Sequence, residues 1–100
     1  MSSPLNSTAA VFADGDPLPL LVSYTLQARA EPGVMPRVVE LFAKRGLVPQ
    51  KWYSTASGPA LTIDVQLGGI ERDVADYIAR CMRQIVGVET VLTAAIPLPG

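Results

Sequence analysis

The chain has 100 residues, with eight basic and nine acidic side chains, one cysteine and no histidine. Because the charges are scattered and no basic stripe with interleaved aromatic residues is present, neither nucleic acid nor a membrane is expected as a partner. The missing histidine excludes histidine-based acid–base catalysis and histidine-ligated metal, and the single cysteine excludes a disulfide within the chain.

Composition divides the chain into three parts. Residues 1–19 contain four proline or glycine residues and no sustained period, so we expect a flexible N-terminal tail. Residues 20–96 are expected to form one domain, followed by residues 97–100 as a C-terminal tail. A domain of this size buries only roughly 60% of its unfolded surface, which favours a homodimer. The apolar run Leu18–Val22 is too short to span a bilayer and lacks a preceding basic region, so we expect a cytoplasmic protein.

A strand, a turn and an amphipathic helix are predicted in the first half of the domain. Apolar and polar residues alternate over Leu20–Arg29, which predicts a strand with one buried face. A Pro-Gly pair predicts a sharp turn at positions 31–33. Apolar residues then recur every three or four positions until Gly46, a typical helix stop. A helix is therefore predicted from about Val34 to Arg45.

A β-hairpin is predicted next. Residues Leu47–Ala56 include good strand formers, and we expect a strand there. Pro49 has no N–H to donate to a neighbouring strand, so the start of this strand is expected to be irregular or edge-like. A Ser-Gly-Pro turn follows, and apolar residues then alternate over Leu61–Leu67. The pair Gly68-Gly69 is expected to end this second strand of the hairpin.

A second helix and a last strand complete the domain. Helical spacing predicts a helix from about Ile70 to Val86, with an apolar face formed by Ile70, Val74, Tyr77, Ile78, Cys81 and Ile85. Gly87 ends this helix, and Val88–Ala94 is the last strand. Two right-handed crossovers then give an α+β, ferredoxin-like βαββαβ fold, in which a four-stranded antiparallel sheet carries both helices on one face.

The sheet face away from the helices is expected to be polar, with Ser23, Thr25, Gln27, Thr62, Asp64 and Gln66. Both an interaction surface and a simple solvated sheet fit this composition. Trp52 and Tyr53 are adjacent on a strand and therefore point to opposite faces. One of them is expected in the core, and the other is a candidate for a dimer or partner contact.

These residues suggest no enzyme active site. A metallochaperone of this shape needs paired cysteines in its first loop, and an RNA-recognition domain needs aromatic residues on the open face, whereas Tyr24 lies in the inward set. A phosphate-handling enzyme needs a basic cradle near a helix start, where this chain has Glu31 and two prolines. We therefore expect no catalytic residue, no metal and no cofactor.

Three segments resemble a known family. The segment Glu31–Met35 with Arg37-Val38, the segment Leu41–Gly46 and the segment Val86–Val91 resemble the ACT domain, and within it the small regulatory subunit of acetolactate synthase. The resemblance covers about Leu21–Thr93. It implies a homodimer with paired sheets, feedback sensing of an amino acid, and a large thiamine-dependent catalytic subunit as partner in branched-chain amino acid biosynthesis. The short chain is similar to the single-domain type, in which stabilising the catalytic subunit matters more than feedback.

The resemblance also implies a ligand site at the dimer interface, where the first loop and helix start of one subunit face the second strand of its neighbour. Backbone N–H groups around Gly33, Val34 and Met35 would hold the carboxylate of the ligand, because unsatisfied donors at a helix start favour anions. The alternative is that Gly33 only shapes the turn.

The chain departs from the family at two positions of that site. Family members that bind valine carry asparagine at the positions of Ala30 and Val48, the second often followed by isoleucine where this chain has Pro49. Both side-chain contacts are missing, so we expect a regulatory subunit with a weak or altered response to amino acids. The alternative is a free-standing homodimeric ACT sensor or binding module with another target.

Overall fold

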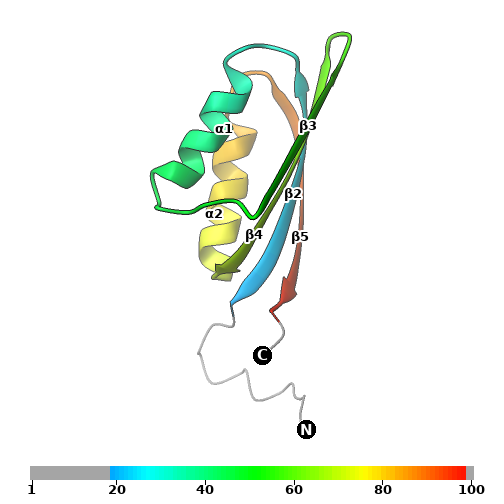
Figure 1. Ribbon diagram of the computed structural model, residues 1–100. Helices are drawn as coiled ribbons and strands as arrows, with labels where there is room; N and C mark the ends of the chain where they lie inside the picture. The colour runs from blue at the N-terminus through cyan, green and yellow to red at the C-terminus, as the bar shows by residue number, and fades with distance from the viewer. Residues whose placement is uncertain (1–18, 99–100) are drawn as a thin grey trace, which may run out of the picture.

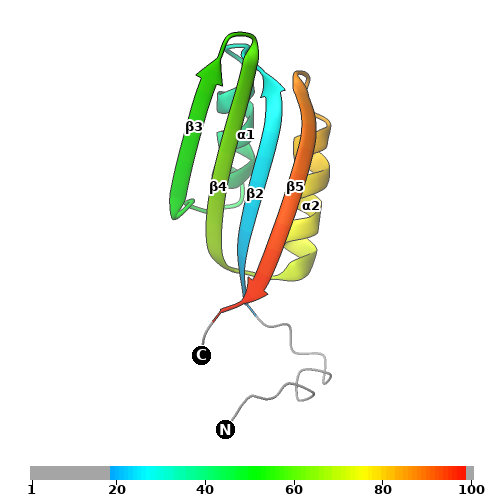
Figure 2. The ribbon, with the colours of Figure 1, turned by 90° about the vertical axis from the view of Figure 1, so that its right-hand side faces the viewer.

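A four-stranded antiparallel sheet carries two helices on one face, so the predicted ferredoxin-like fold is confirmed (Figures 1 and 2). The computed structural model describes residues 19–98, so nearly all of the expected N-terminal tail and the last two residues lie outside the described part. The elements are β2 (Leu20–Arg29), α1 (Val34–Ala43), β3 (Lys51–Ser57), β4 (Ala60–Ile70), α2 (Arg72–Arg83) and β5 (Val88–Pro97). Across the sheet the order is β3-β4-β2-β5.

Helix α1 starts at Val34, as its sequence predicts, and ends at Ala43, slightly before the predicted end near Arg45. Its buried face consists of Val34, Val38 and Phe42. The N–H of Leu47 donates to the carbonyl of Phe42 at 2.9 Å, and the N–H of Gly46 donates to that of Ala43 at 3.0 Å. With Gly46 at a φ of +68°, these bonds form a Schellman motif, which explains why the helix stops here.

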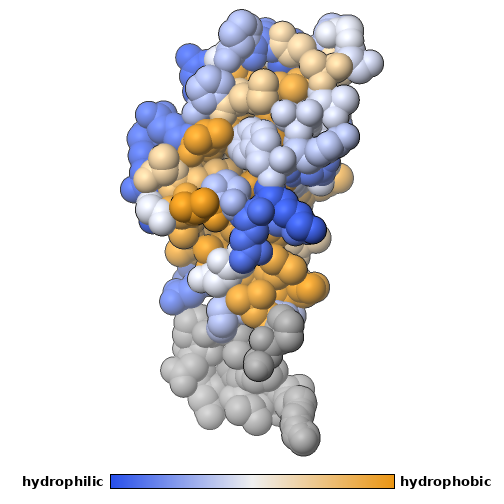
Figure 3. Space-filling model, viewed as in Figure 1, coloured by the Kyte–Doolittle hydropathy of each residue, from blue (hydrophilic) through white to orange (hydrophobic). Residues whose placement is uncertain are grey.

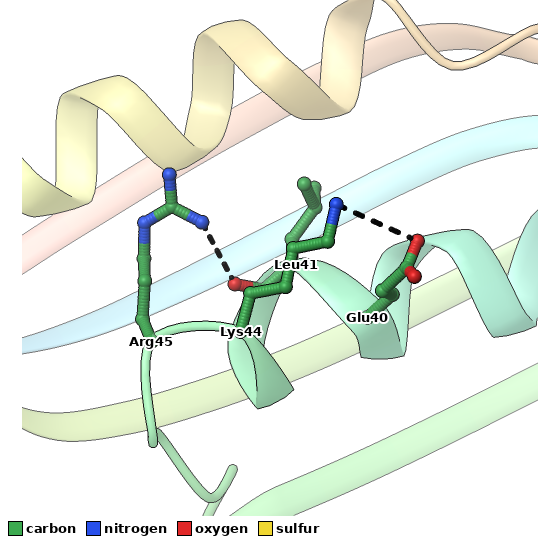
Figure 4. Close-up of polar contacts among 4 residues, drawn as sticks. All are labelled: Glu40, Leu41, Lys44 and Arg45. Atoms are coloured by element: carbon green, nitrogen blue, oxygen red, sulfur yellow. Dashed lines mark hydrogen bonds and ion pairs between the residues drawn. The ribbon is translucent and has the colours of Figure 1, made fainter.

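Two polar contacts close the last turn of α1 (Figure 4). Lys44 Nζ lies 4.0 Å from Glu40 Oε1, an exposed i,i+4 pair worth about 0.5 kcal/mol or less. Arg45 Nη1 donates to the carbonyl of Leu41 at 3.0 Å and so satisfies one of the carbonyls left free at the helix end. The helix terminus is therefore capped by side chains as well as by backbone.

Tyr24 sits at the centre of the core between the sheet and the helices. Its side chain is fully buried, as the alternation of β2 predicts, and its ring centroid lies 6.3 Å from that of Phe42. The hydroxyl donates to the carbonyl of Ala75 at 2.7 Å. Burial raises the pKa of the Tyr24 hydroxyl far above its usual range, with a further contribution from the Asp76 carboxylate. The hydroxyl therefore remains a donor, and it ties β2 to α2.

The hairpin strands differ from their predicted bounds. Strand β3 starts at Lys51, later than predicted, because Pro49 has no N–H to donate and the pairing begins only where the N–H of Gln50 reaches the carbonyl of Gln66, at 2.8 Å. The predicted end of the second strand at Gly68-Gly69 is wrong, since β4 continues to its Ile70 terminus. Gly69 takes a φ of +80° beside a shift of register in the ladder, a distortion that glycine tolerates without steric cost.

Helix α2 is shorter than predicted, because the residue expected to begin it, Ile70, pairs with Leu20 in the sheet. Its predicted apolar face is also partly wrong. The buried residues are Ala75, Ile78, Ala79 and Met82. Tyr77 is exposed, and Cys81, expected in the core, is only half-buried. Two alanines on the buried face let the helix approach the sheet closely, which moves the larger residues to its flanks.

The open face of the sheet is polar at its centre, as predicted, and its polar side chains bond to one another across strands. Thr25 donates to Asp64 at 2.8 Å, Thr62 donates to Gln27 at 3.0 Å, and Gln66 donates to Ser23 at 3.3 Å. The edge strand β5 adds exposed apolar side chains to this face, Leu92 and Ile96. This strand also runs to Pro97, beyond the predicted end at Ala94.

Candidate functional site

The first loop connects β2 to α1 and is built around two turns of backbone hydrogen bonding. The N–H of Glu31 donates to the carbonyl of Arg29 at 2.8 Å, and the N–H of Val34 donates to that of Glu31 at 3.1 Å. Among the described residues, the N–H groups of Gly33 and Met35 have no backbone acceptor. Two of the three predicted donors are therefore available at the start of α1, where the helix dipole favours an anion.

Arg37 places a positive charge beside these donors. Its Nη1 donates to the carbonyl of Gly33 at 3.3 Å, and its guanidinium occupies the space that a side chain at Gly33 would fill. Gly33 itself has a φ of −80°, which any residue can adopt, so the turn does not require its conformational freedom. Its value here lies in the close approach of the Arg37 guanidinium. The helix start thus combines backbone donors with a guanidinium, a combination suited to a carboxylate.

A shallow, almost wholly apolar hollow of about 250 Å³ lies next to the loop. We name it the first-loop hollow, and it is lined by Ala30, Glu31, Pro32, Met35, Ala56 and Leu61. Its one charged lining residue, Glu31, forms an ion pair of 3.1 Å with Arg29. The size and lining suit a small aliphatic group, while the carboxylate of Glu31 suits an ammonium or another hydrogen-bond donor.

The remaining predicted site residues lie at the other end of the sheet. Val48 and Pro49 precede the start of β3, whereas the first loop meets its far end, where the N–H of Ala30 donates to the carbonyl of Pro59 at 2.9 Å. About 20 Å of strand separates the two groups. Val48 is 83% exposed. One chain therefore brings Ala30, Gly33, Val34 and Met35 together and leaves Val48 and Pro49 apart.

The structure adds a supporting residue that the sequence pattern did not reveal. Gly87, predicted only to stop α2, has a φ of +100°, and its carbonyl accepts the N–H of Arg29 at 2.8 Å. A Cβ placed on Gly87 would lie 3.0 Å from both Val34 Cγ2 and Glu31 Oε1. The loop after α2 therefore packs directly beneath the first loop and holds it in place.

Other kinds of site were sought over the same part of the chain. Residues 19–98 contain no group of three or more His, Cys, Asp or Glu side chains placed to hold a metal ion. Neither α1 nor α2 is long and apolar enough to cross a membrane. The first loop with its hollow therefore remains the candidate site, and it contains Ala30, Gly33, Val34 and Met35 of the predicted residues.

Several solved structures share the fold of this chain. The fold is similar to the ACT domain of GTP pyrophosphokinase from Chlorobium tepidum, with a TM-score of 0.66 and 15% identity over 74% of this chain and 96% of that chain. It is also similar to the C-terminal domain of the MgtC protein from Mycobacterium tuberculosis, with a TM-score of 0.61 and 17% identity over 84% and 93% of the two chains. An uncharacterized protein from Thermotoga maritima matches with a TM-score of 0.61 and 16% identity over 81% and 99%.

These identities are low enough that the structural matches establish the fold alone. No curated protein sequence matches the chain. The model of the ACT-like domain family, however, matches residues 18–98, which is most of the chain and includes every element of the fold. The chain therefore belongs to the ACT-like domain family.

Proposed function

We propose that the chain is a non-catalytic regulatory subunit of acetolactate synthase, in which a dimer of ACT modules binds and stabilises the catalytic subunit and responds weakly to amino acids. Family membership supports a regulatory, ligand-binding module. The acetolactate synthase partner rests on the resemblance of the Glu31–Met35, Leu41–Gly46 and Val86–Val91 segments.

One observation carries the ligand-binding part of the proposal. The start of α1 offers the N–H groups of Gly33 and Met35 and the guanidinium of Arg37, next to an apolar hollow sized for a small aliphatic side chain. The carboxylate of an amino acid would lie at the helix start, and its side chain in the first-loop hollow. This arrangement needs no side chain to act as acid, base or nucleophile.

A second copy of the chain would complete the site. Strand β3 pairs only with β4 in the described residues, so its outer edge is open, and Met35 and Val39 expose apolar surface on the adjacent helix. On the face shown in Figure 3, apolar residues lie among hydrophilic ones over α1. If β3 pairs antiparallel with its own copy, the start of one β3 lies beside the end of the other. Val48 and Pro49 of one copy then approach the first loop of its partner, which one chain alone does not achieve.

The weak amino-acid response follows from the side chains at these positions. Ala30 lines the hollow with a methyl group, and Val48 is apolar and exposed, so neither donates or accepts a hydrogen bond through its side chain. A hydrogen bond to a charged group is worth about 1.5–3 kcal/mol. Without two of them, affinity for the ligand falls by a factor of roughly 10² to 10⁴.

The partner is tested by co-purification. The tagged chain, expressed together with the large thiamine-dependent acetolactate synthase subunit of the same genome, is expected to form a stable complex and to raise the thermal stability of that subunit. An unrelated thiamine-dependent enzyme provides the control and should not bind. A chain that forms homodimers but never binds the acetolactate synthase subunit would reject this partner and favour a free-standing ACT sensor with another target.

A further inference from the structure

A second hollow lies on the open face of the sheet, away from the first loop. It has a volume of about 290 Å³, and we name it the sheet-face hollow. Its lining residues are Ser23, Tyr24, Lys51, Tyr53, Asp64, Val65 and Gln66. Tyr24 and Val65 are buried on the helix side, so the side chains available on this face come from the other five residues. All of these five are polar or amphipathic.

The pairing of the strands fixes how these side chains are arranged. Lys51 pairs with Gln66, and Tyr53 pairs with Asp64, so Lys51 and Asp64 are diagonal neighbours on adjacent strands. Diagonal neighbours are about 7 Å apart, within reach of a lysine side chain. Nevertheless, neither of the ion pairs found among residues 19–98 contains Lys51 or Asp64. An ammonium and a carboxylate therefore border the same hollow without forming a direct ion pair.

Asp64 is held in place by its other neighbours. The hydroxyl of Thr25 donates to Asp64 Oδ1 at 2.8 Å, which fixes the carboxylate and leaves Oδ2 without a protein donor among the described residues. Beside Lys51, the side-chain amide of Gln66 donates to the hydroxyl of Ser23 at 3.3 Å. Tyr53 is 69% exposed and stands beside the hollow as a large aromatic wall. The carboxylate is thus oriented before any ligand arrives, and the aromatic ring adds contact area.

We propose that the sheet-face hollow binds a small zwitterion, with the carboxylate of the ligand at Lys51 and its ammonium at Asp64. A molecule of this class satisfies both charges at once, whereas a simple anion or cation meets the like charge of the other residue. Tyr53 covers the aliphatic part of the ligand and lies within reach of its ammonium. Because the groups are exposed, the binding is weak, in the millimolar range typical of a few solvated contacts. The site is independent of the first-loop hollow and of the acetolactate synthase partner.

Titration followed by two-dimensional amide NMR tests this site on the full chain. The probes are glycine, β-alanine and γ-aminobutyrate, which separate the two charges by increasing lengths, with acetate and methylammonium as singly charged controls. We expect saturable shifts at Ser23, Tyr53, Asp64 and Gln66 with at least one zwitterion and none with the controls. Shifts confined to Ala30–Met35 would place the ligand in the first-loop hollow and overturn the sheet-face site while leaving the proposed function intact.

Two charge-removing variants complete the test. Lys51→Met and Asp64→Asn alter exposed side chains and are each expected to weaken zwitterion binding by about fivefold or more. Lys44→Met removes an exposed lysine elsewhere and should leave the affinity unchanged. The proposal would be overturned if the unaltered chain and all three variants bound the zwitterion with equal affinity. It would also be overturned if no zwitterion caused saturable shifts at concentrations up to about 100 mM.

Discussion

The double variant Ala30→Asn/Val48→Asn is expected to bind valine roughly 10² to 10⁴ times more tightly than the unaltered chain. Each asparagine restores one side chain that members of the resembled family use on the ligand, and each charged hydrogen bond is worth about 1.5–3 kcal/mol. Both positions are exposed in the chain, so neither change disturbs the core. Isothermal titration with valine measures the gain directly.

The control for this gain replaces two apolar residues of β5, away from the first loop, with asparagine. Leu92 and Ala94 lie on the open face of the sheet, and Leu92 is 67% exposed. The variant Leu92→Asn/Ala94→Asn should therefore bind valine no better than the unaltered chain. An Ala30→Asn/Val48→Asn variant that shows the affinity of this control would mean that the site is not formed by these residues.

Replacing Gly87 with alanine is expected to lower the free energy of unfolding by about 2–5 kcal/mol. The φ of +100° costs a residue with a Cβ about 1–2 kcal/mol. The added methyl group would also lie 3.0 Å from Val34 Cγ2 and Glu31 Oε1, and crowding of this kind costs typically ~1–3 kcal/mol. Denaturant unfolding followed by circular dichroism measures the change, and amide shifts at Glu31 and Val34 should show that the first loop moves.

Gly46 supplies the matched control for Gly87. It also has a positive φ, +68°, but a Cβ placed on it meets no atom within 4 Å. Gly46→Ala is therefore expected to cost only about 1 kcal/mol, through backbone strain at the helix end. If both substitutions cost the same, the loop after α2 is not packed tightly against the first loop at Gly87.

The sequence predicts the fold because its local patterns are consistent with one another. Alternation in Leu20–Arg29 identifies the buried side of the central strand, including Tyr24, since burial of that face decides the register. The start of helix α1 is predicted because Pro36 is acceptable in the first turn, and its end is predicted closely because Gly46 provides the Schellman stop. These features depend on residues close together in the sequence, so the sequence pattern is sufficient to predict them.

Features that depend on distant contacts were missed. Small residues such as Ala75 and Ala79 give a weak periodic signal, yet they form the buried face of α2 because they allow close packing. The Gly68-Gly69 pair resembles a strand end, but Gly69, with a positive φ, lies at a shift of register, and Ile70 beyond it still pairs with Leu20. The pattern could not predict which helical face would pack or where the ladder would bend.

The candidate site also combines features that depend on nearby residues with features that depend on distant contacts. The donors at Gly33 and Met35 follow from the predicted helix start, which is a local property. Ala56, which lines the first-loop hollow, comes from a different element, and the support from Gly87 comes from the far end of the domain. Only the tertiary fold brings these residues to one place, so no spacing in the sequence indicates them.

Titration of the unaltered chain with valine, leucine, isoleucine and serine is the most direct test of the proposed weak response to amino acids. We expect no saturable heat at micromolar concentrations for any of the four, because Ala30 and Val48 cannot replace the missing hydrogen bonds. Weak binding near the millimolar range fits the donors that remain at the start of α1. A micromolar dissociation constant for valine would contradict the proposed weak response and show that other residues recognise the ligand.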